Sequence, residues 1–171
     1  MLAVPAGRCF GASSAEHRLS TGMKMAERKL QVFVSSTFSD LQDIRQAAVA
    51  AILKAGHIPA GMELFTSGDT SQMDVIRRWI EESDVYMLLL GARYGSIEPT
   101  TGLSYTELEY DYAVSLGKPF FSIVLTEKAV DHRVTEHGKS VLELSNPSQL
   151  ADFKAKALSK MSSFCDDAKD V

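Results

Sequence analysis

The sequence predicts a three-layer α/β fold, in which a parallel β-sheet is covered by helices on both faces. Apolar runs that are typical of strands alternate with segments of helical periodicity through residues 29–125. The connections between them are short, which favours parallel strands joined by crossover helices. Two of the apolar runs, beginning at Val85 and at Pro119, are almost uninterrupted, as in strands that are covered on both faces.

The first strand is predicted over residues 29–36, where the β-rich run KLQVFVSS ends in small polar residues. A helix is expected next, with Ser39 as its N-cap and Gly56 at C′. Asp40 and Asp43 favour its first turn, because acidic side chains complement a helix N-terminus. The apolar face of this helix repeats at helical spacing and comprises Leu41, Ile44, Ala48, Ala51 and Ile52.

A second, short strand is predicted over residues 57–65. Pro59 has no backbone N–H to donate, so this strand is expected at or near a sheet edge. After the polar loop TSGDTSQ, a helix is predicted over residues 73–84, with an apolar face made of Val75, Ile76, Trp79 and Ile80. The third strand begins at Val85, in the segment VYMLLLGARYG.

The last regular part of the chain is predicted to be a helix over residues 105–116 followed by a buried strand over 119–125. Residues 126–140 are less regular and are expected as a polar excursion. A final helix is predicted in NPSQLADFKAKALSKMSSF (146–164), with Asn146 as its N-cap and Pro147 at N1.

These elements belong to one expected domain over residues 29–165. The chain has 171 residues, of which 45% are hydrophobic and 23% charged, enough for a sizeable core. Residues 1–28 are predicted to be a disordered tail or to precede the true start, at Met23 or Met25, and they also bear a weak likeness to a transit peptide. Residues 166–171 are expected to begin a linker to a downstream region that this sequence lacks.

Charge and cysteine content narrow the classes of function. The formal net charge of −4 argues against a nucleic-acid or membrane surface. Cys9 and Cys165 lie at opposite ends of the chain and give neither a disulfide framework nor a metal-ligand spacing, so we expect a reducing, cytoplasmic setting. No stretch is apolar for the roughly 18 residues that a membrane helix requires.

The helix over residues 105–116 brings an acidic residue onto its apolar side. At about 100° per residue, Glu109 falls in the middle of the apolar arc, whereas Glu107 and Asp111 fall on the far side. The arc consists of Tyr105, Leu108, Tyr112, Ala113 and Leu116. A carboxylate in such a setting shifts its pKa or finds a partner. Glu109 is therefore either a site residue or the partner of an arginine such as Arg93.

Other segments are expected at the same edge of the sheet, since strand-to-helix loops cluster at the carboxyl ends of parallel strands. Ser35, Ser36 and Thr37 supply hydroxyl and backbone N–H groups ahead of a helix N-terminus, which suits an anion, although turn and capping chemistry would also explain them. Arg93, in the glycine-rich GARYG, could contact a phosphate or Glu109, or be a solvated turn residue. The acids of ELFTSGD (63–69) are expected to be solvated.

Several chemical motifs are absent from the sequence. There is no nucleophile elbow, P-loop or dinucleotide-binding GxGxxG. His132 and His137 lie five residues apart in a polar segment and are expected to be surface histidines rather than metal ligands. We therefore expect neither a metal nor a bound cofactor.

Four ordered motifs carry a resemblance to a known family. They are VFVSSTFSDLQDIR, GMELF, SDVYMLLLGARYGS and GLSYTELEYDYAVSLGKP. Together they resemble the TIR-like domain-of-unknown-function family 4062, over about residues 30–125 and into the C-terminal helix. That family stands at the N-termini of large NACHT-type and other signalling ATPases and in bacterial proteins of suspected defence roles. The resemblance implies a flavodoxin-like or TIR-like sheet.

The pattern is more distantly similar to two kinds of enzyme. In Toll/interleukin-receptor (TIR) domains that cleave NAD, a glutamate stands eight residues before a glycine, as Glu109 stands eight before Gly117 here. Nucleoside deoxyribosyltransferases have a catalytic glutamate in a helix that ends A-x-x-x-G-K-P, and this chain has AVSLGKP. Both break an N-glycosidic bond next to a ribose, which implies that Glu109 is catalytic.

The resemblance also implies binding roles. NAD would be a substrate rather than a cofactor, with phosphate held at Ser35, Ser36 and Thr37. Phe38 or Tyr105 would stack on the base, and Arg93 would contact phosphate or orient Glu109. The implied partners are a nucleotide, other copies of the domain and the downstream domains of a longer protein, with no nucleic acid and no membrane.

Three functions stay open at this point. One is cleavage of NAD or a related nucleotide. Another is a non-catalytic interaction module that self-associates, since many TIR domains are adaptors and Tyr105 stands where TIR enzymes often have a tryptophan. The third is transfer of a nucleobase or deoxyribose, although GLS replaces the Asp-Gly-Thr of the transferases.

Overall fold

The computed structural model describes residues 28–61 and 72–171, and in these residues the strands form one five-stranded parallel sheet of order β2-β1-β3-β4-β5. The strands are β1 (Gln31–Ser36), β2 (Ile58–Ala60), β3 (Val85–Leu90), β4 (Phe120–Leu125) and β5 (Ser162–Cys165). The strand order reverses between β1 and β3, and ligands of such sheets bind at the carboxyl ends of the strands at that point.

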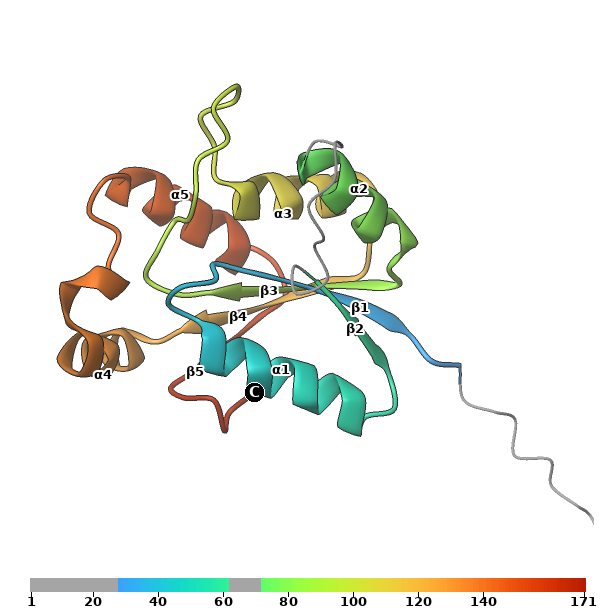
Figure 1. The fold of residues 1–171 in the computed structure, drawn as a ribbon, viewed down its shortest axis with the longest axis horizontal. Coiled ribbons are helices and arrows are strands. Elements are labelled where there is room, and N and C mark those ends of the chain that lie inside the picture. Colours follow the sequence, from blue (N-terminus) through green and yellow to red (C-terminus); the bar gives the residue numbers. More distant parts are fainter. Residues whose placement is uncertain (1–27, 62–71) are drawn as a thin grey trace, which may run out of the picture.

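Helices cover both faces of the sheet, so the predicted three-layer α/β fold is confirmed (Figure 1). The helices are α1 (Gln42–Lys54), α2 (Gln72–Glu82), α3 (Tyr105–Ser115), α4 (Glu127–His137) and α5 (Pro147–Leu158), with a 3₁₀ turn, η2 (Gly138–Val141), after α4. One core cluster joins α2, α3 and α5 to the sheet through residues such as Ile80, Tyr110 and Phe153. The other core cluster lies under α1 and α4 and includes Ile44 and Ala129.

The elements of the first half lie close to the predicted ones, with one correction at the start of α1. Gly56 follows α1 with a φ of 83°, as expected of a C′ residue. Ser39 is not the N-cap, because the helix begins only at Gln42 and Leu41 occupies the cap position. β2 is an edge strand as predicted but is only three residues long, and the predicted continuation over residues 62–65 lies outside the described residues.

Two elements of the second half were wrongly predicted. The polar excursion contains the helix α4, which buries little beyond Ala129 and therefore leaves no apolar period in the sequence. The final helix was predicted to extend to Phe164, but α5 ends at Leu158 and the chain then forms β5, whose four residues with a single hydrophobic pair give too short a strand pattern. The final helix does start with Pro147 at N1, although the Asn146 side chain makes no capping hydrogen bond.

The phase of α3 differs in part from the predicted arc. Glu109 and Ala113 are buried as expected, together with Thr106 and Tyr110. Leu116 is wrongly placed on the arc, because it lies at the end of the helix and is 42% exposed. Glu107 was expected in solvent but is buried, because α5 packs over this side of α3.

The chain after β5 is in contact with the rest of the domain. Asp166 pairs with Lys128 of α4 at 2.9 Å, and Val171 packs against the core cluster under α1 and α4. Among the helices of the described part of the chain, none combines the length and apolar character needed to cross a membrane.

Candidate functional site

Glu109 lies on the face of α3 that packs against the sheet, directly above the end of β1. Its side chain is almost fully buried, with 2% of the residue exposed. The Ser35 hydroxyl, near the end of β1, donates a hydrogen bond of 2.5 Å to Oε2 of Glu109. The burial that the helical arc predicted is confirmed, and the partner is a serine of a strand rather than Arg93.

Burial raises the pKa of the Glu109 carboxyl to about 7. The Ser35 hydrogen bond and the positive charge of Arg45 act in the opposite direction but do not offset the loss of hydration. The phenol of Tyr86, on β3, also has a pKa well above its ordinary value, first because it is buried and then because of the nearby Glu109 charge. Both protonation states of Glu109 are therefore populated at neutral pH.

The Glu109 side chain borders a cavity of about 230 Å³ at the carboxyl ends of β1 and β3. Five of the sequence-predicted binding residues line this cavity with Glu109, namely Ser36, Thr37, Phe38, Arg93 and Tyr105. They come from the last residue of β1, the β1–α1 loop, the β3–α3 loop and the first turn of α3. The topological switch point thus brings together residues that are as much as 73 positions apart, from Ser36 to Glu109.

Ser35 has a different position from the other predicted binding residues. It is 1% exposed and lies behind Glu109, where its hydroxyl is committed to the carboxylate. The hydrogen bond from Ser35 would therefore position the Glu109 side chain. Arg93 donates a hydrogen bond of 3.1 Å to the carbonyl of Ser140, which ties the β3–α3 loop to η2.

Tight packing holds the two loops that frame the cavity. At Gly91, which follows β3, an added Cβ would lie 2.8 Å from Oδ2 of Asp40 and 2.9 Å from Cδ2 of Leu41. Asp40 in turn accepts a hydrogen bond of 2.6 Å from the Thr37 hydroxyl. Gly95 has a φ of +96°, and an added Cβ there would lie 3.0 Å from the Thr37 methyl carbon. Glycine at these two positions lets the two loops approach each other.

A polar cavity of about 460 Å³ adjoins the Glu109 cavity and shares Ser39 and Arg93 with it. Its walls also include Arg133, His137 and Asp43. Arg133 makes a two-pronged contact with the Asp43 carboxylate, at 2.8 and 2.7 Å. His132 and His137 lie on α4 rather than in a loop, and no group of three metal-ligating side chains occurs in residues 28–61 and 72–171.

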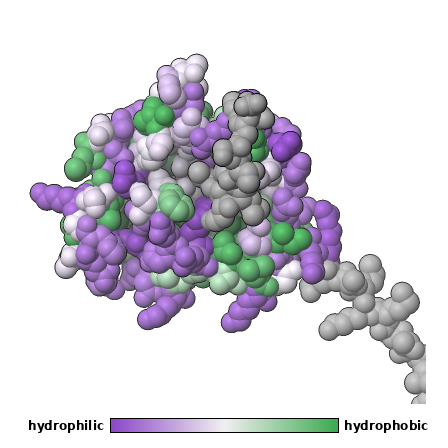
Figure 2. Space-filling model, viewed as in Figure 1, coloured by the Kyte–Doolittle hydropathy of each residue, from purple (hydrophilic) through white to green (hydrophobic). Residues whose placement is uncertain are grey.

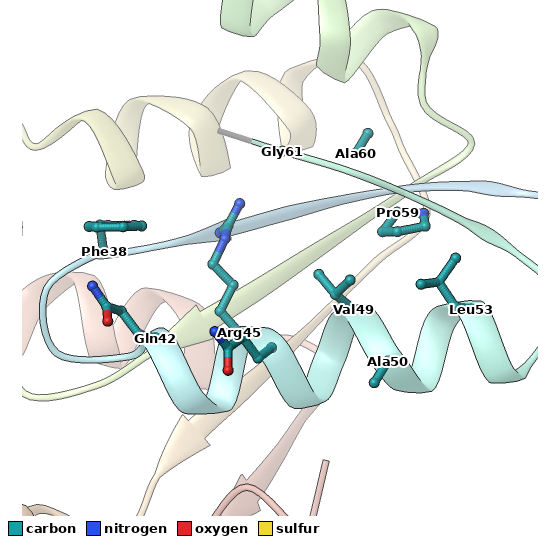
Figure 3. A pocket seen from close by; sticks show the side chains of 10 residues that line it. Phe38, Gln42, Arg45, Val49, Ala50, Leu53, Pro59, Ala60 and Gly61 are labelled. Atoms are coloured by element: carbon teal, nitrogen blue, oxygen red, sulfur yellow. The ribbon is translucent and has the colours of Figure 1, made fainter. Parts of the chain in front are cut away.

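A larger and more apolar cavity, of about 490 Å³, lies between the outer face of α1 and β2 (Figure 3). Val49, Leu53 and Pro59 line its apolar part, and Phe38 borders both this cavity and the Glu109 cavity. Hydrophobic residues gather over α1 and β2 in a view that is otherwise mostly hydrophilic (Figure 2). The lining that the described residues provide has no carboxylate, so the chemistry is assigned to the smaller cavity.

Comparison with protein families agrees with the four motifs. Residues 31–171 match the family described as Domain of unknown function (DUF4062). The chain belongs to this family. The match begins at the first residue of β1 and extends through β5, so the DUF4062 domain includes the strand that sequence patterns missed. No curated protein matches the chain.

Two buried polar groups of this DUF4062 domain were missed from the sequence. The Glu107 carboxylate accepts hydrogen bonds from the Tyr94 hydroxyl, at 2.5 Å, and from Nζ of Lys156, at 2.8 Å. Lys156 also contacts Asp111, so this cluster fastens α5 to α3. Tyr86, the other missed residue, lies in a strand where an aromatic residue is ordinary core material. Nothing in the sequence marks its hydroxyl as a neighbour of Glu109.

Proposed function

We propose that this domain cleaves the N-glycosidic bond of NAD or a related nucleotide, with Glu109 as the catalytic carboxylate. The observation that carries the proposal is that Glu109 is buried but borders a cavity, and that its hydrogen-bond partner in the described residues is the neutral hydroxyl of Ser35. A carboxylate that borders a cavity in this way can stabilise positive charge on a bound sugar.

In the proposed reaction, the base departs with the electron pair of its bond to C1′ of the ribose. The positive charge that develops on the sugar is stabilised by Glu109, or the carboxylate attacks C1′ and forms a glycosyl ester. Water then adds its oxygen to C1′, in the ester case with cleavage of the bond between C1′ and the carboxylate oxygen, and loses a proton to the carboxylate or to solvent. Nicotinamide leaves as a neutral base, since its ring nitrogen is cationic in NAD, so this substrate needs no general acid.

The two adjoining cavities suit different parts of the substrate. The Glu109 cavity, at about 230 Å³, is large enough for a ribose and base but not for a whole dinucleotide. Phe38, which is 59% exposed, and Tyr105 offer aromatic faces to the base. Arg93 borders both this cavity and the polar one beside it, so we assign phosphate to Arg93.

The resemblance adds a setting to this chemistry. We propose a TIR-like effector in cytoplasmic signalling or defence, whose activity rises when the copies of a longer protein assemble. In that setting, the hydrolase would be silent in the dispersed chain, so assays require concentrated or oligomerised protein.

The test is release of nicotinamide from NAD, measured by chromatography, with the chain concentrated or fused to an oligomerising partner. We expect Glu109→Gln to lower the rate roughly 100-fold while the circular dichroism spectrum is unchanged. Glu107→Gln is the matched control, because Glu107 lies on the same helix and is buried but contacts Tyr94 and Lys156.

Three other outcomes of this test would contradict the proposal. An unchanged rate in Glu109→Gln would remove Glu109 from the mechanism. No consumption of NAD in any assembled form would favour a non-catalytic interaction module. Exchange of a free base into a nucleoside would favour a transferase of the deoxyribosyltransferase kind.

A further inference from the structure

The two edges of the sheet differ in the backbone groups that they expose. At the β2 edge, the N–H of Ile58 donates to the carbonyl of Leu30, so Ile58 and Ala60 turn their backbone groups toward β1. Pro59 therefore occupies the outward position between them and has no N–H to donate. Proline in an edge strand blocks pairing with another chain.

The β5 edge has no proline. The carbonyls of Met161 and Cys165 accept hydrogen bonds from the N–H groups of Ser122, within β4, and of Thr126, just after it. Because strand residues alternate in direction, Ser162 and Phe164 turn their N–H and C=O groups toward the free edge. Phe164 is 58% exposed and Met161 is 75% exposed, so this edge combines open backbone groups with exposed hydrophobic side chains.

We infer that β5 pairs in antiparallel orientation with β5 of a second copy of this chain, about a two-fold axis that passes through Ser163. In this register, Ser162 lies opposite Phe164 of the second copy, and both residues have outward backbone groups. They exchange both of their hydrogen bonds, once on each side of the axis. Ser163 lies opposite itself, in a pair without backbone hydrogen bonds.

Charge complementarity selects this register. Lys160 and Asp166 lie in the bends that flank β5, each three residues from Ser163, so this register brings the end of β5 that carries Lys160 in one copy next to the end that carries Asp166 in the other, on both sides of the axis. Shifting the register by one pair in either direction separates these charges. Asp166 already pairs with Lys128 at 2.9 Å, but its side chain is 43% exposed and can be reached by a second cation.

The same register covers the exposed aromatic side chain. Phe164 is level with Val124 of β4, which belongs to the core cluster under α3 and α5. The two Phe164 side chains would be diagonal neighbours on that face of the joined sheet, within reach of each other. Four-residue strands bury little area, so we expect a weak, concentration-dependent dimer rather than an obligate one.

The test is a disulfide at the two-fold axis. In antiparallel pairs without backbone hydrogen bonds, the Cα atoms lie about 4.5 Å apart, within the range that a disulfide can bridge. In a Cys9→Ser background, we expect Ser163→Cys to form covalent dimers under mild oxidation, at a rate roughly tenfold above that of Ser115→Cys. Ser115 is the matched control because it is exposed on α3, away from β5.

A second substitution distinguishes disulfide dimers that form through β5 pairing from those that form when two chains collide at random. Phe164→Pro removes an outward N–H that β4 does not use, so it should abolish the Ser163→Cys dimer while circular dichroism shows a folded chain. Lys160→Glu, which places like charges opposite each other, should also slow dimer formation if the proline variant does not fold. Equal rates for Ser163→Cys and Ser115→Cys, or a Ser163→Cys dimer that both substitutions leave unaffected, would overturn the inference. The outcome does not depend on whether Glu109 is catalytic.

Discussion

At neutral pH, the Glu109 carboxyl is about half ionised, because burial raises its pKa to about 7. The proposed reaction uses the ionised form, since a carboxylate stabilises a cationic sugar and a protonated carboxyl does not. The same residue therefore links the rate of the reaction and the stability of the fold to pH, and each link gives a prediction.

The rate of nicotinamide release should rise with pH through about 7 and level off above it, as the Glu109 carboxyl ionises. The measurement is the rate at saturating NAD from pH 5.5 to about 8.5, with a check by circular dichroism that the chain stays folded. A rate that falls through this range would mean that the protonated carboxyl is the active form and that Glu109 acts as an acid.

The stability of the chain should fall as pH rises through the same group. The carboxyl has an ordinary pKa of 4.5 and a folded value of about 7, so between these values the folded chain binds more protons than the unfolded chain. Ionising Glu109 in the folded chain then costs about 3 kcal/mol above pH 7. We expect Glu109→Gln to gain about 3 kcal/mol relative to wild type between pH 5 and pH 8 in urea unfolding. Glu127→Gln, on the exposed first turn of α4, should show no such gain.

At the scale of single elements, the helices that bury a regular apolar face were predicted from the sequence, and the helix that buries little was not. α1 and α2 bury regular apolar faces, and both were found within a few residues. α4 buries little beyond Ala129, so its sequence has no helical period, although Thr126 is an N-cap residue that could have marked its start. The predicted binding residues that line the cavity could be grouped from the sequence because loops at one edge of a parallel sheet must meet.

Contacts between elements could not be predicted from such patterns. Glu109 was found because a carboxylate on an apolar arc is visible in the sequence. The burial of Glu107 depends on Lys156, which is 49 residues away and on another helix. Ser35 could be placed at the sheet edge, but its hydrogen bond to Glu109 depends on how α3 packs over β1.

The close contact at Gly91 gives a prediction for the β1–α1 loop. A methyl group at this position would meet Oδ2 of Asp40 and Cδ2 of Leu41, so these two buried side chains, which follow the residues of this loop that line the cavity, must shift. We expect Gly91→Ala to destabilise the chain by about 1–3 kcal/mol and also to lower the rate of nicotinamide release. Gly117→Ala is the control, because its strain comes from a φ of +65° with open space around it, and it should lower stability while leaving the activity of the folded chain unchanged. Equal losses of rate in both variants would mean that the effect is general and not a property of this loop.

For the whole molecule, the sheet separates two regions that can act independently. The Glu109 cavity lies over β1 and β3, and the β5 edge lies beyond β4 at one margin of the sheet (Figure 1). An assembly through β5 would leave the cavity open to a nucleotide. Binding at the cavity should then be visible in the thermal stability of the whole chain, because a ligand of the folded state stabilises all of it.

Glu109→Gln should bind NAD but consume it only slowly, and this makes it the chain in which binding can be measured. A ligand at about 100 times its Kd adds about 2.7 kcal/mol, which raises the Tm of a domain of this size by roughly 5–11 °C. We expect this rise in differential scanning fluorimetry of Glu109→Gln at saturating NAD, and its loss when Arg93→Ala is added, because Arg93 borders both the reaction cavity and the polar cavity. The Arg93→Ala variant should be compared with its own Tm without nucleotide, since it also loses the hydrogen bond to Ser140. An equal rise with and without Arg93 would move the phosphate site elsewhere, and no rise at all would mean that the cavity does not take this nucleotide.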